Sequence, residues 1–220
     1  MEIIETFQKV AREFKKKGYN LYLIGGSTRD YLLHRPFFEC DCATDATPIA
    51  MTKIIPNGDY KNQFFGNVNI IIDGIPFEIT TFRNEDEYQD LRHPRKITFT
   101  KDMQEDYQRR DFSINAIYMD MDLHLYCFER NKEDLENHLI KSIKDASFKI
   151  RQYSLRIVSA IRFKVELDFN FDDDLETAIK SNINLINMIK KTKLEAEINK
   201  AKKENQEKIR LYIDSLLGNK

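Results

Sequence analysis

A pair of glycines followed by two spaced carboxylates constrains this chain more than any other feature. The segment Gly25-Gly26-Ser27-Thr28-Arg29-Asp30 follows an apolar run at 21–24, and Glu39-Cys40-Asp41-Cys42 comes soon after it. The glycines predict a turn that ends a strand, followed by a short helix at 30–33. Glu39 and Asp41 stand at i and i+2, so on an extended strand they share one face. Such neighbours repel each other unless a divalent cation neutralises them.

This arrangement is typical of two-metal phosphoryl-transfer sites, whose metals lie about 3.5–4 Å apart. The glycines let the backbone approach a triphosphate, and a helix N-terminus favours anions. A tight turn followed by a polar edge strand is the alternative, and Gly-Gly alone would favour it. Cys40 and Cys42 fall on the opposite face of the strand, so we expect small buried side chains there rather than zinc ligands.

Periodicity predicts strands and helices in the first part of the chain. We expect an amphipathic helix at 3–17, strands at 19–24 and 38–43, and a helix that begins at Thr47-Pro48. Asp73-Gly74 predicts a hairpin between strands at 67–72 and 75–82. Glu78 would then lie on a strand that can return beside the carboxylate strand.

The remaining segments predict a polar mobile loop and then helices. We expect the loop at 84–105 and a helix at 106–119 with Ile114, Ile117 and Tyr118 facing inward. Residues 131–190 and 194–217 show helical spacing. The chain therefore predicts an α+β fold, with a small mixed sheet in a head that is followed by an α-helical neck.

Several motifs occur in a fixed order along the chain. They are Gly25-Gly26-x-x-Arg29-Asp30, Glu39-Cys40-Asp41, Ala43-Thr44-Asp45-Ala46-x-Pro48, Phe77–Arg83, Arg92-His93-Pro94, Arg109-Arg110-Asp111-Phe112-Ser113-Ile114-Asn115-Ala116, Leu155-Arg156 and Ala160–Phe163. Together they cover roughly residues 1–190 and are more specific than any single pattern. In this order they resemble the class II nucleotidyltransferases, which comprise the CCA-adding tRNA nucleotidyltransferases and the bacterial poly(A) polymerases.

The resemblance implies a domain plan and a set of ligands. It implies a catalytic, polymerase-beta-like nucleotidyltransferase head at 1–130, a helical neck for nucleobase recognition at 131–190, and a truncated helical C-terminus at 191–220. It also implies Mg²⁺ as cofactor and CTP and ATP as substrates.

The resemblance further assigns roles to residues of the head. Glu39 and Asp41 would be the catalytic metal ligands, and Glu78 is a third carboxylate by position, with a solvent-facing strand residue as an equally weighted alternative. The triphosphate site would be built from Gly25, Gly26, Arg29, Asp30 and Arg110. Asp111 and Asn115, at i and i+4 on the expected helix, would read the ribose 2′-hydroxyl.

Three positions depart from the family pattern. Glu39 replaces an aspartate, and its extra methylene shifts the carboxylate in a site where Mg²⁺ demands near-ideal geometry. Tyr153 replaces the carboxylate of the base-reading motif, and its hydroxyl is a poorer acceptor for an exocyclic amine. Ser159 replaces an arginine, while Arg156 and Arg162 are kept as nucleotide-binding residues. We therefore expect this protein to select CTP and ATP over UTP and GTP less strongly than the family pattern implies.

These observations predict a template-independent RNA nucleotidyltransferase that adds CMP and AMP to an RNA 3′ end, with tRNA as the favoured acceptor. A poly(A) polymerase, or an enzyme that adds only CC or only A, is an alternative. A catalytically weakened RNA-binding paralogue is another, favoured by the three departures and the short C-terminus. The short C-terminus also suggests that a second copy or another chain supplies the missing helices.

Composition excludes little. Lysine and arginine number 35 against 36 acidic residues, a net charge of −1, which neither demands nor excludes a nucleic-acid partner. The three cysteines do not form a disulfide framework, which predicts the cytoplasm. No stretch approaches the ~20 apolar residues of a membrane span, so we expect no membrane association.

Overall fold

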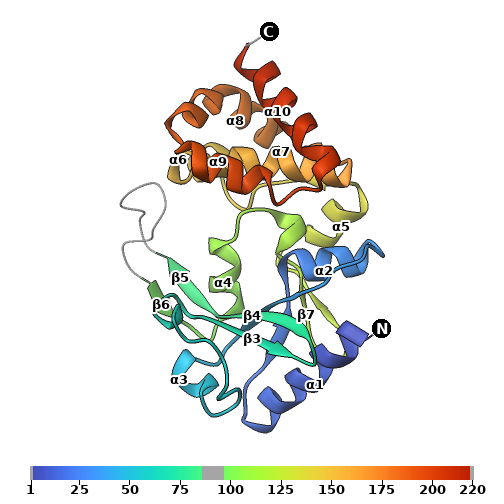
Figure 1. Ribbon diagram of the computed structural model, residues 1–220, viewed down its shortest axis with the longest axis vertical. Helices are drawn as coiled ribbons and strands as arrows, with labels where there is room; N and C mark the ends of the chain where they lie inside the picture. Colours follow the sequence, from blue (N-terminus) through green and yellow to red (C-terminus); the bar gives the residue numbers. More distant parts are fainter. Residues whose placement is uncertain (1, 86–96, 219–220) are drawn as a thin grey trace. The chain divides into compact units, whose positions relative to one another are not determined.

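The computed structural model describes residues 2–85 and 97–218, which form two compact units (Figure 1). The first unit holds residues 2–85, 97–110 and 114–132, and the second holds 111–113 and 133–218. The motif Arg92-His93-Pro94 lies outside the described residues. The division at 130 and 190 into head, neck and C-terminus stays a prediction.

A six-stranded mixed sheet organises the first unit. Its order is β3-β4-β2-β1-β7-β8, built from Asn67–Ile72, Ile75–Thr81, Cys40–Thr44, Leu21–Leu23, Tyr118–Met119 and Leu125–Tyr126. Strands β2 and β4 run parallel, whereas the other neighbours pair antiparallel. The hairpin around Asp73-Gly74 is confirmed, because β3 and β4 pair from Ile72 and Ile75 outward.

The core of the first unit explains the apolar periodicity. Helix α1 (Glu2–Lys16) buries Phe7, Val10 and Phe14, which belong to one cluster with Cys40 and Cys42 of β2. The two cysteines are therefore core residues, as expected. Thr47 caps helix α3 (Pro48–Met51) by accepting from the amide of Ala50, which confirms that predicted helix start.

The segment predicted as a loop at 84–105 contains regular structure. Strands β5 (Arg83–Glu85) and β6 (Ile97–Phe99) form a two-stranded antiparallel sheet, and helix α4 (Met103–Arg109) begins inside the same segment. Asp102 caps α4 by accepting from the amide of Gln104. The loop prediction is therefore wrong at both described ends.

The predicted helix at 106–119 is also wrong. Helix α4 ends at Arg109, and a 3₁₀ turn (Ser113–Asn115) and then β7 follow. The backbone of 111–113 bonds to 141–143 instead of to its own preceding turn: Ser113 donates to the Lys141 carbonyl and Ile143 to the Asp111 carbonyl. The buried side chains Ile114, Ile117 and Tyr118 are nonetheless inward, as predicted. Asp111 and Asn115 therefore do not share a helical face.

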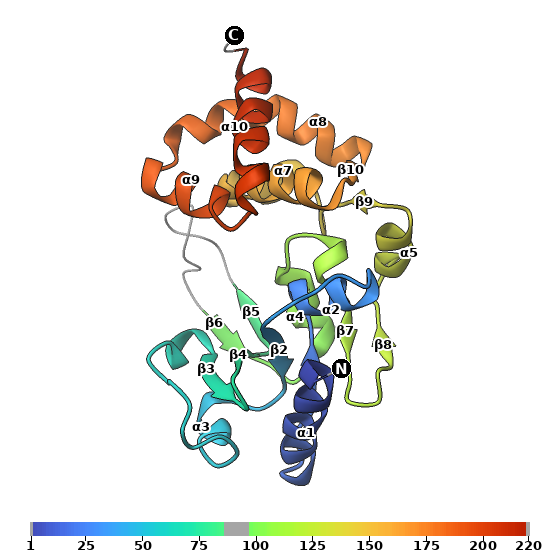
Figure 2. The ribbon, with the colours of Figure 1, turned by 45° about the vertical axis from the view of Figure 1, so that its right-hand side comes forward.

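The second unit is mainly helical, as predicted. It contains α6 (Ala146–Gln152), α7 (Leu155–Leu167), α8 (Asp173–Asn182), α9 (Lys191–Ile198) and α10 (Lys203–Leu217), with a 3₁₀ helix at Ile183–Met188. Helix α7 contacts α6, α9 and α10. Short strands β9 (Leu139–Ile140) and β10 (Asn170–Phe171) pair in parallel beside α8 (Figure 2). Helix α5 (Asn131–Glu136) spans the boundary between the two sets of residues.

Residues 194–217 form parts of two helices rather than one, because the chain turns between Ile198 and Lys203.

Across residues 2–85 and 97–218, we find no helix that combines the length and apolarity needed to cross a membrane.

Candidate active site

The paired glycines begin helix α2 (Gly25–Leu32) directly, whereas the sequence predicted a helix only from residue 30. Gly25 has φ +67°, a conformation that L side chains rarely adopt. A Cβ there would lie 2.9 Å from Oδ2 of Asp41. Glycine is therefore needed at this position both for its backbone conformation and for the close approach of the Asp41 carboxylate.

Ser27 fixes the glycine turn to the carboxylate segment. Its hydroxyl donates to the Glu39 carbonyl at 2.9 Å and accepts from the Asp41 amide at 2.8 Å. The Ile24 amide donates to the Asp41 carbonyl at 2.9 Å. Sequence reasoning missed Ser27, because a serine after two glycines carries only a turn signal.

The expected carboxylates approach each other from two parallel strands. Asp41 of β2 and Glu78 of β4 are register partners, so the prediction that Glu78 returns beside the carboxylate strand is confirmed. Glu78 is exposed and accepts from Nδ2 of Asn67 at 2.6 Å. Glu39 is exposed and precedes β2, which begins at Cys40 rather than at residue 38.

Asp41 is the carboxylate of this group whose ionisation the surroundings disfavour. Burial raises the pKa of Asp41 to about 6, and the charges of Glu39 and Glu78 add to the shift. The Gly26 amide and the Arg110 guanidinium act in the opposite direction. Carboxylate oxygens are the ligands that Mg²⁺ prefers, so an under-neutralised group of three fits such a cation.

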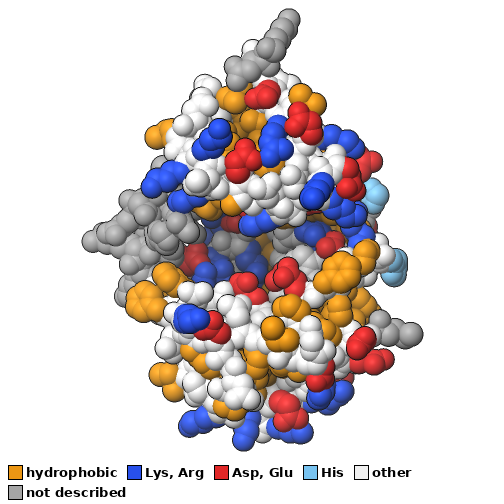
Figure 3. Space-filling view, viewed as in Figure 1, with side chains coloured by type: hydrophobic (Ala, Val, Ile, Leu, Met, Phe, Trp, Pro, Cys, Tyr) orange, Lys and Arg blue, Asp and Glu red, His pale blue; other side chains and the backbone are white. Residues whose placement is uncertain are grey.

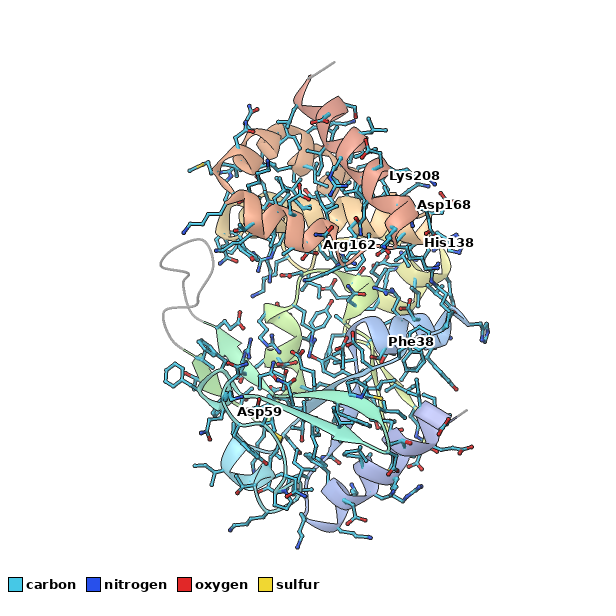
Figure 4. All side chains as sticks on the ribbon, viewed as in Figure 1. Phe38, Asp59, His138, Arg162, Asp168 and Lys208 are labelled. Atoms are coloured by element: carbon cyan, nitrogen blue, oxygen red, sulfur yellow. The ribbon has the colours of Figure 1, made fainter. Side chains whose placement is uncertain are left out.

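An open groove of about 770 Å³ lies along this part of the first unit. Its lining includes Glu39, Glu78, Asp59 and Asn69. Asp59 pairs with Asn69 of β3 through backbone bonds, and Figure 4 labels it beside that strand. Figure 3 shows acidic side chains on this face, over the β3–β4 hairpin. A ligand entering this groove meets negative charge.

A second acidic group lies in the β7–β8 turn. Within the described part of the chain, Asp120, Asp122 and His124 bring one ligand atom each within 4.8 Å of the others. Oδ1 of Asp120 accepts from the amides of Asp122 and His124, and its Oδ2 accepts from the Tyr126 hydroxyl. These hydrogen bonds stabilise the turn, which accounts for the close approach of the three side chains.

Arg29 is buried within the first unit and holds Asn115. Its guanidinium donates to both oxygens of Asp30, at 3.0 and 2.9 Å, and to Oδ1 of Asn115 at 2.8 Å. The structure therefore brings these three predicted residues together at α2. Arg29 orients Asn115, a contact that the sequence spacing did not predict.

Arg110 is held by two residues that sequence reasoning missed. Its Nη2 donates to Oδ2 of Asp106 at 2.8 Å, and its Nε donates to the Tyr118 hydroxyl at 2.9 Å. Burial alone would lower the pKa of Arg110, but Tyr118 and Asp106 outweigh it and raise the pKa above its ordinary value. Arg110 therefore stays charged within electrostatic range of Asp41.

The candidate base-reading residues lie in the second unit. Arg156 is buried; its Nε donates to Oδ1 of Asp111 at 2.6 Å and its Nη1 to the Lys149 carbonyl at 2.6 Å. Its guanidinium carbon lies 5.8 Å from the centre of the Tyr153 ring. Tyr153, Arg156 and Asp111 thus form one local group, although Asp111 was predicted to act with Asn115.

Arg162 pairs with two carboxylates of the second unit. Its Nε and Nη2 donate to Oε1 of Glu197, each at 3.1 Å, and its Nη1 donates to Glu166 at 3.2 Å. Ser159 donates to the same Glu197 oxygen at 2.7 Å. Figure 4 labels Arg162 on α7, and these bonds connect α7 to α9.

Comparisons with known proteins show which family the chain resembles. Residues 21–141 match the model of the poly A polymerase head domain. The chain is 35% identical over 199 residues to the CCA-adding enzyme of Staphylococcus epidermidis, and 37% identical over 188 residues to that of Lactobacillus johnsonii. These alignments cover 90% and 86% of this chain, and 50% and 47% of the relatives.

Solved structures show the same fold. The crystal structure of the Bacillus stearothermophilus CCA-adding enzyme in complex with CTP matches with a TM-score of 0.80 and 30% identity, over 88% of this chain and 47% of that one. A tRNA nucleotidyltransferase complexed with a primer tRNA and an incoming ATP analog matches with a TM-score of 0.76 and 23% identity, over 94% and 59%. The chain spans about half the length of the curated relatives it matches.

Proposed function

The chain belongs to the poly A polymerase head domain family, and from this premise we propose that it is a template-independent RNA nucleotidyltransferase. It would add CMP and AMP from CTP and ATP to the 3′ end of an RNA, with tRNA as the acceptor we favour. The observation that carries the proposal is the pairing of Asp41 with Glu78 beside Gly25, with Glu39 close enough to raise the pKa of Asp41. We place the protein in the cytoplasm, in keeping with its three free cysteines.

Asp41 and Glu39, with Glu78 as a third ligand, would hold Mg²⁺. The metal, when bound, would supply charge neutralisation and activation of the attacking 3′-hydroxyl. The protein's own residues supply the rest of the site. Gly25 and Gly26 allow close backbone approach, and Arg110 holds positive charge beside the carboxylates for the triphosphate.

Polar side chains would position the nucleoside. Asn115, oriented by Arg29 and Asp30, and Asp111 are the proposed contacts to the ribose. Arg156 and Tyr153 are the proposed contacts to the base. Arg162 would support them from α7 through its pairs with Glu166 and Glu197, since those bonds already occupy its guanidinium nitrogens.

The test is metal-dependent labelling of an RNA 3′ end with each of the four NTPs. Wild type should incorporate CMP and AMP in Mg²⁺ and nothing in EDTA. Asp41→Asn should abolish incorporation, since it removes a ligand charge at the centre of the group. Glu13→Gln is the matched control, because Glu13 is an exposed carboxylate of helix α1 that pairs with Lys16 and does not line the groove.

The products separate the alternatives. A run of AMP alone supports a poly(A) polymerase, and CMP alone or a single AMP supports a partial CC- or A-adding enzyme. A wild type that binds tRNA but labels it with no NTP would support the weakened paralogue and contradict the proposal.

A further inference from the structure

Asp106 is a buried carboxylate of the first unit that accepts hydrogen bonds from several residues, and neither the motif nor the proposed chemistry assigns it a role. Its side chain has no exposed surface. It accepts from Arg109 at 2.8 Å, from Arg110 at 2.8 Å, from the Tyr118 hydroxyl at 2.7 Å and from the Arg83 amide at 3.2 Å. A buried carboxylate with this many donors fixes their positions strongly.

Asp106 joins three elements that are distant in sequence. It lies on α4, the Arg83 amide begins β5, and Tyr118 begins β7. Burial would raise the pKa of Asp106, but Arg110, Arg109 and Tyr118 lower it below its ordinary value. The carboxylate therefore stays ionised and keeps its donors.

Tyr118 contacts the Arg110 guanidinium through both its hydroxyl and its ring. Its hydroxyl donates to Asp106 and accepts from Nε of Arg110, and its ring lies 5.0 Å from the guanidinium carbon. Tyr22 and Phe82 pack edge-on against the same ring. The ring cannot turn without disturbing this packing, so the hydroxyl is held in place.

Further guanidinium groups lie beside Asp106. Arg83 pairs with Glu85 at 2.7 Å, and Arg109 lies 3.6 Å from the same carboxylate. Arg110 is the member of this group whose charge acts on Asp41, and a guanidinium suits a polyanion such as a triphosphate.

We propose that Asp106 and the Tyr118 hydroxyl are positioning residues for nucleotide binding, which hold the Arg110 guanidinium in the orientation that receives the triphosphate. This inference rests on the proposed function for the identity of the ligand. It assigns the two residues an effect on nucleoside triphosphate affinity through geometry, beyond their contribution to folding.

Asp106→Asn distinguishes positioning from simple charge, because the two mechanisms predict opposite signs. If Arg110 acted only as a charge, removal of the Asp106 charge would tighten triphosphate binding. If Asp106 positions Arg110, the Asn variant binds triphosphate roughly tenfold more weakly, since a charged acceptor is lost. Tyr118→Phe leaves the charge unchanged and should weaken binding roughly three- to tenfold.

The measurement is isothermal titration calorimetry of each folded variant with ATP and with CTP in Mg²⁺. Tyr60→Phe is the matched control, since it removes a hydroxyl that bonds to the Ile55 carbonyl in the same unit. It should leave both dissociation constants unchanged. In steady-state assays the KM for NTP should rise more than kcat falls, whereas a purely structural defect would lower kcat with KM unchanged.

The outcomes separate this inference from the proposed function. Unchanged or tighter binding in Tyr118→Phe overturns the positioning role even if Asp106→Asn fails to fold, and leaves the proposed function intact. A wild type that binds triphosphate but transfers no nucleotide overturns the proposed function, while weaker binding by the variants still supports the positioning role. A wild type that binds no triphosphate overturns the inference.

Discussion

Asp41 and Glu78 occupy directly paired positions of the parallel strands β2 and β4. Paired residues of neighbouring strands lie about 4.8 Å apart and share a face, so two carboxylates meet across the ladder. Like charges in such positions destabilise a sheet. The repulsion between these two carboxylates destabilises the folded protein unless a cation neutralises it. The stability of the fold and the binding of a metal therefore depend on the same side chains.

We expect Asp41→Asn to stabilise the metal-free protein at high pH. The folded-state pKa of Asp41 is raised to about 6, so folding favours the protonated form. The stability that this group contributes is full below its ordinary pKa and is lost as the pH rises through about 6. At pH 8 in EDTA the Asn variant should exceed wild type by up to roughly 3 kcal/mol.

Urea unfolding at several pH values checks this expectation. The difference should shrink toward pH 4, where Asp41 of the folded wild type is protonated and uncharged like asparagine, and Mg²⁺ should reduce it at pH 8. A stability difference that stays constant from pH 4 to pH 8 would show that the Asp41 charge is not its source.

Gly25→Ala should impair the site more than a glycine replacement elsewhere. The new Cβ would meet Oδ2 of Asp41 at 2.9 Å, in addition to the strain of φ +67°. Gly74→Ala is the matched control: its φ is +81°, and nothing lies within 4 Å of the added Cβ. Positive φ alone should cost each variant about 1–2 kcal/mol.

Only Gly25→Ala should also lose nucleotide transfer, measured on RNA 3′ ends. Equal losses of stability with transfer intact in both would contradict the close approach.

Glu39→Asp should raise nucleotide transfer or leave it unchanged. The aspartate restores the residue of the family pattern and shortens the side chain in a site where Mg²⁺ tolerates little misplacement. The Glu39 backbone is held by Ser27, so the change affects the side chain alone. The comparison is kcat at saturating Mg²⁺ and NTP. A large fall in kcat would mean that this site has adapted to glutamate.

Local signals made much of the fold predictable. Asp73-Gly74 specified the hairpin, Thr47-Pro48 specified the start of α3, and the alternation at Cys40 and Cys42 placed both thiols in the core. Each of these features depends on a few adjacent residues. The candidate metal site was predictable for the same reason, since two of its carboxylates are separated by a single residue.

Long-range pairing made the rest unpredictable. The apolar spacing around Ile114 suggested a helix, but the backbone of 111–113 bonds to 141–143. Asp111 consequently meets Arg156 rather than sharing a face with Asn115. The role of Asp106 depends on Arg83 and Tyr118, which no helical or strand spacing connects to it. A single sequence carries no signal for such contacts.

Base choice should depend on Tyr153, which ends α6 beside the fixed guanidinium of Arg156. In the family pattern a carboxylate at this position accepts from the amino group that cytosine and adenine share. A tyrosine hydroxyl accepts less well, and the loss of one such contact should weaken discrimination by about 1–3 kcal/mol. We therefore expect wild type to choose CTP and ATP over UTP and GTP less sharply than its relatives do.

Tyr153→Asp should sharpen that choice, because the new carboxylate lies next to Arg156 and supplies the missing acceptor. Tyr153→Phe is the control: it keeps the ring and removes the hydroxyl, so its discrimination should equal that of wild type or fall slightly. The measurement is kcat/KM for all four NTPs on one acceptor RNA. Strict use of CTP and then ATP by wild type would contradict the prediction and assign the selection to Arg156, to Arg162 or to the RNA itself.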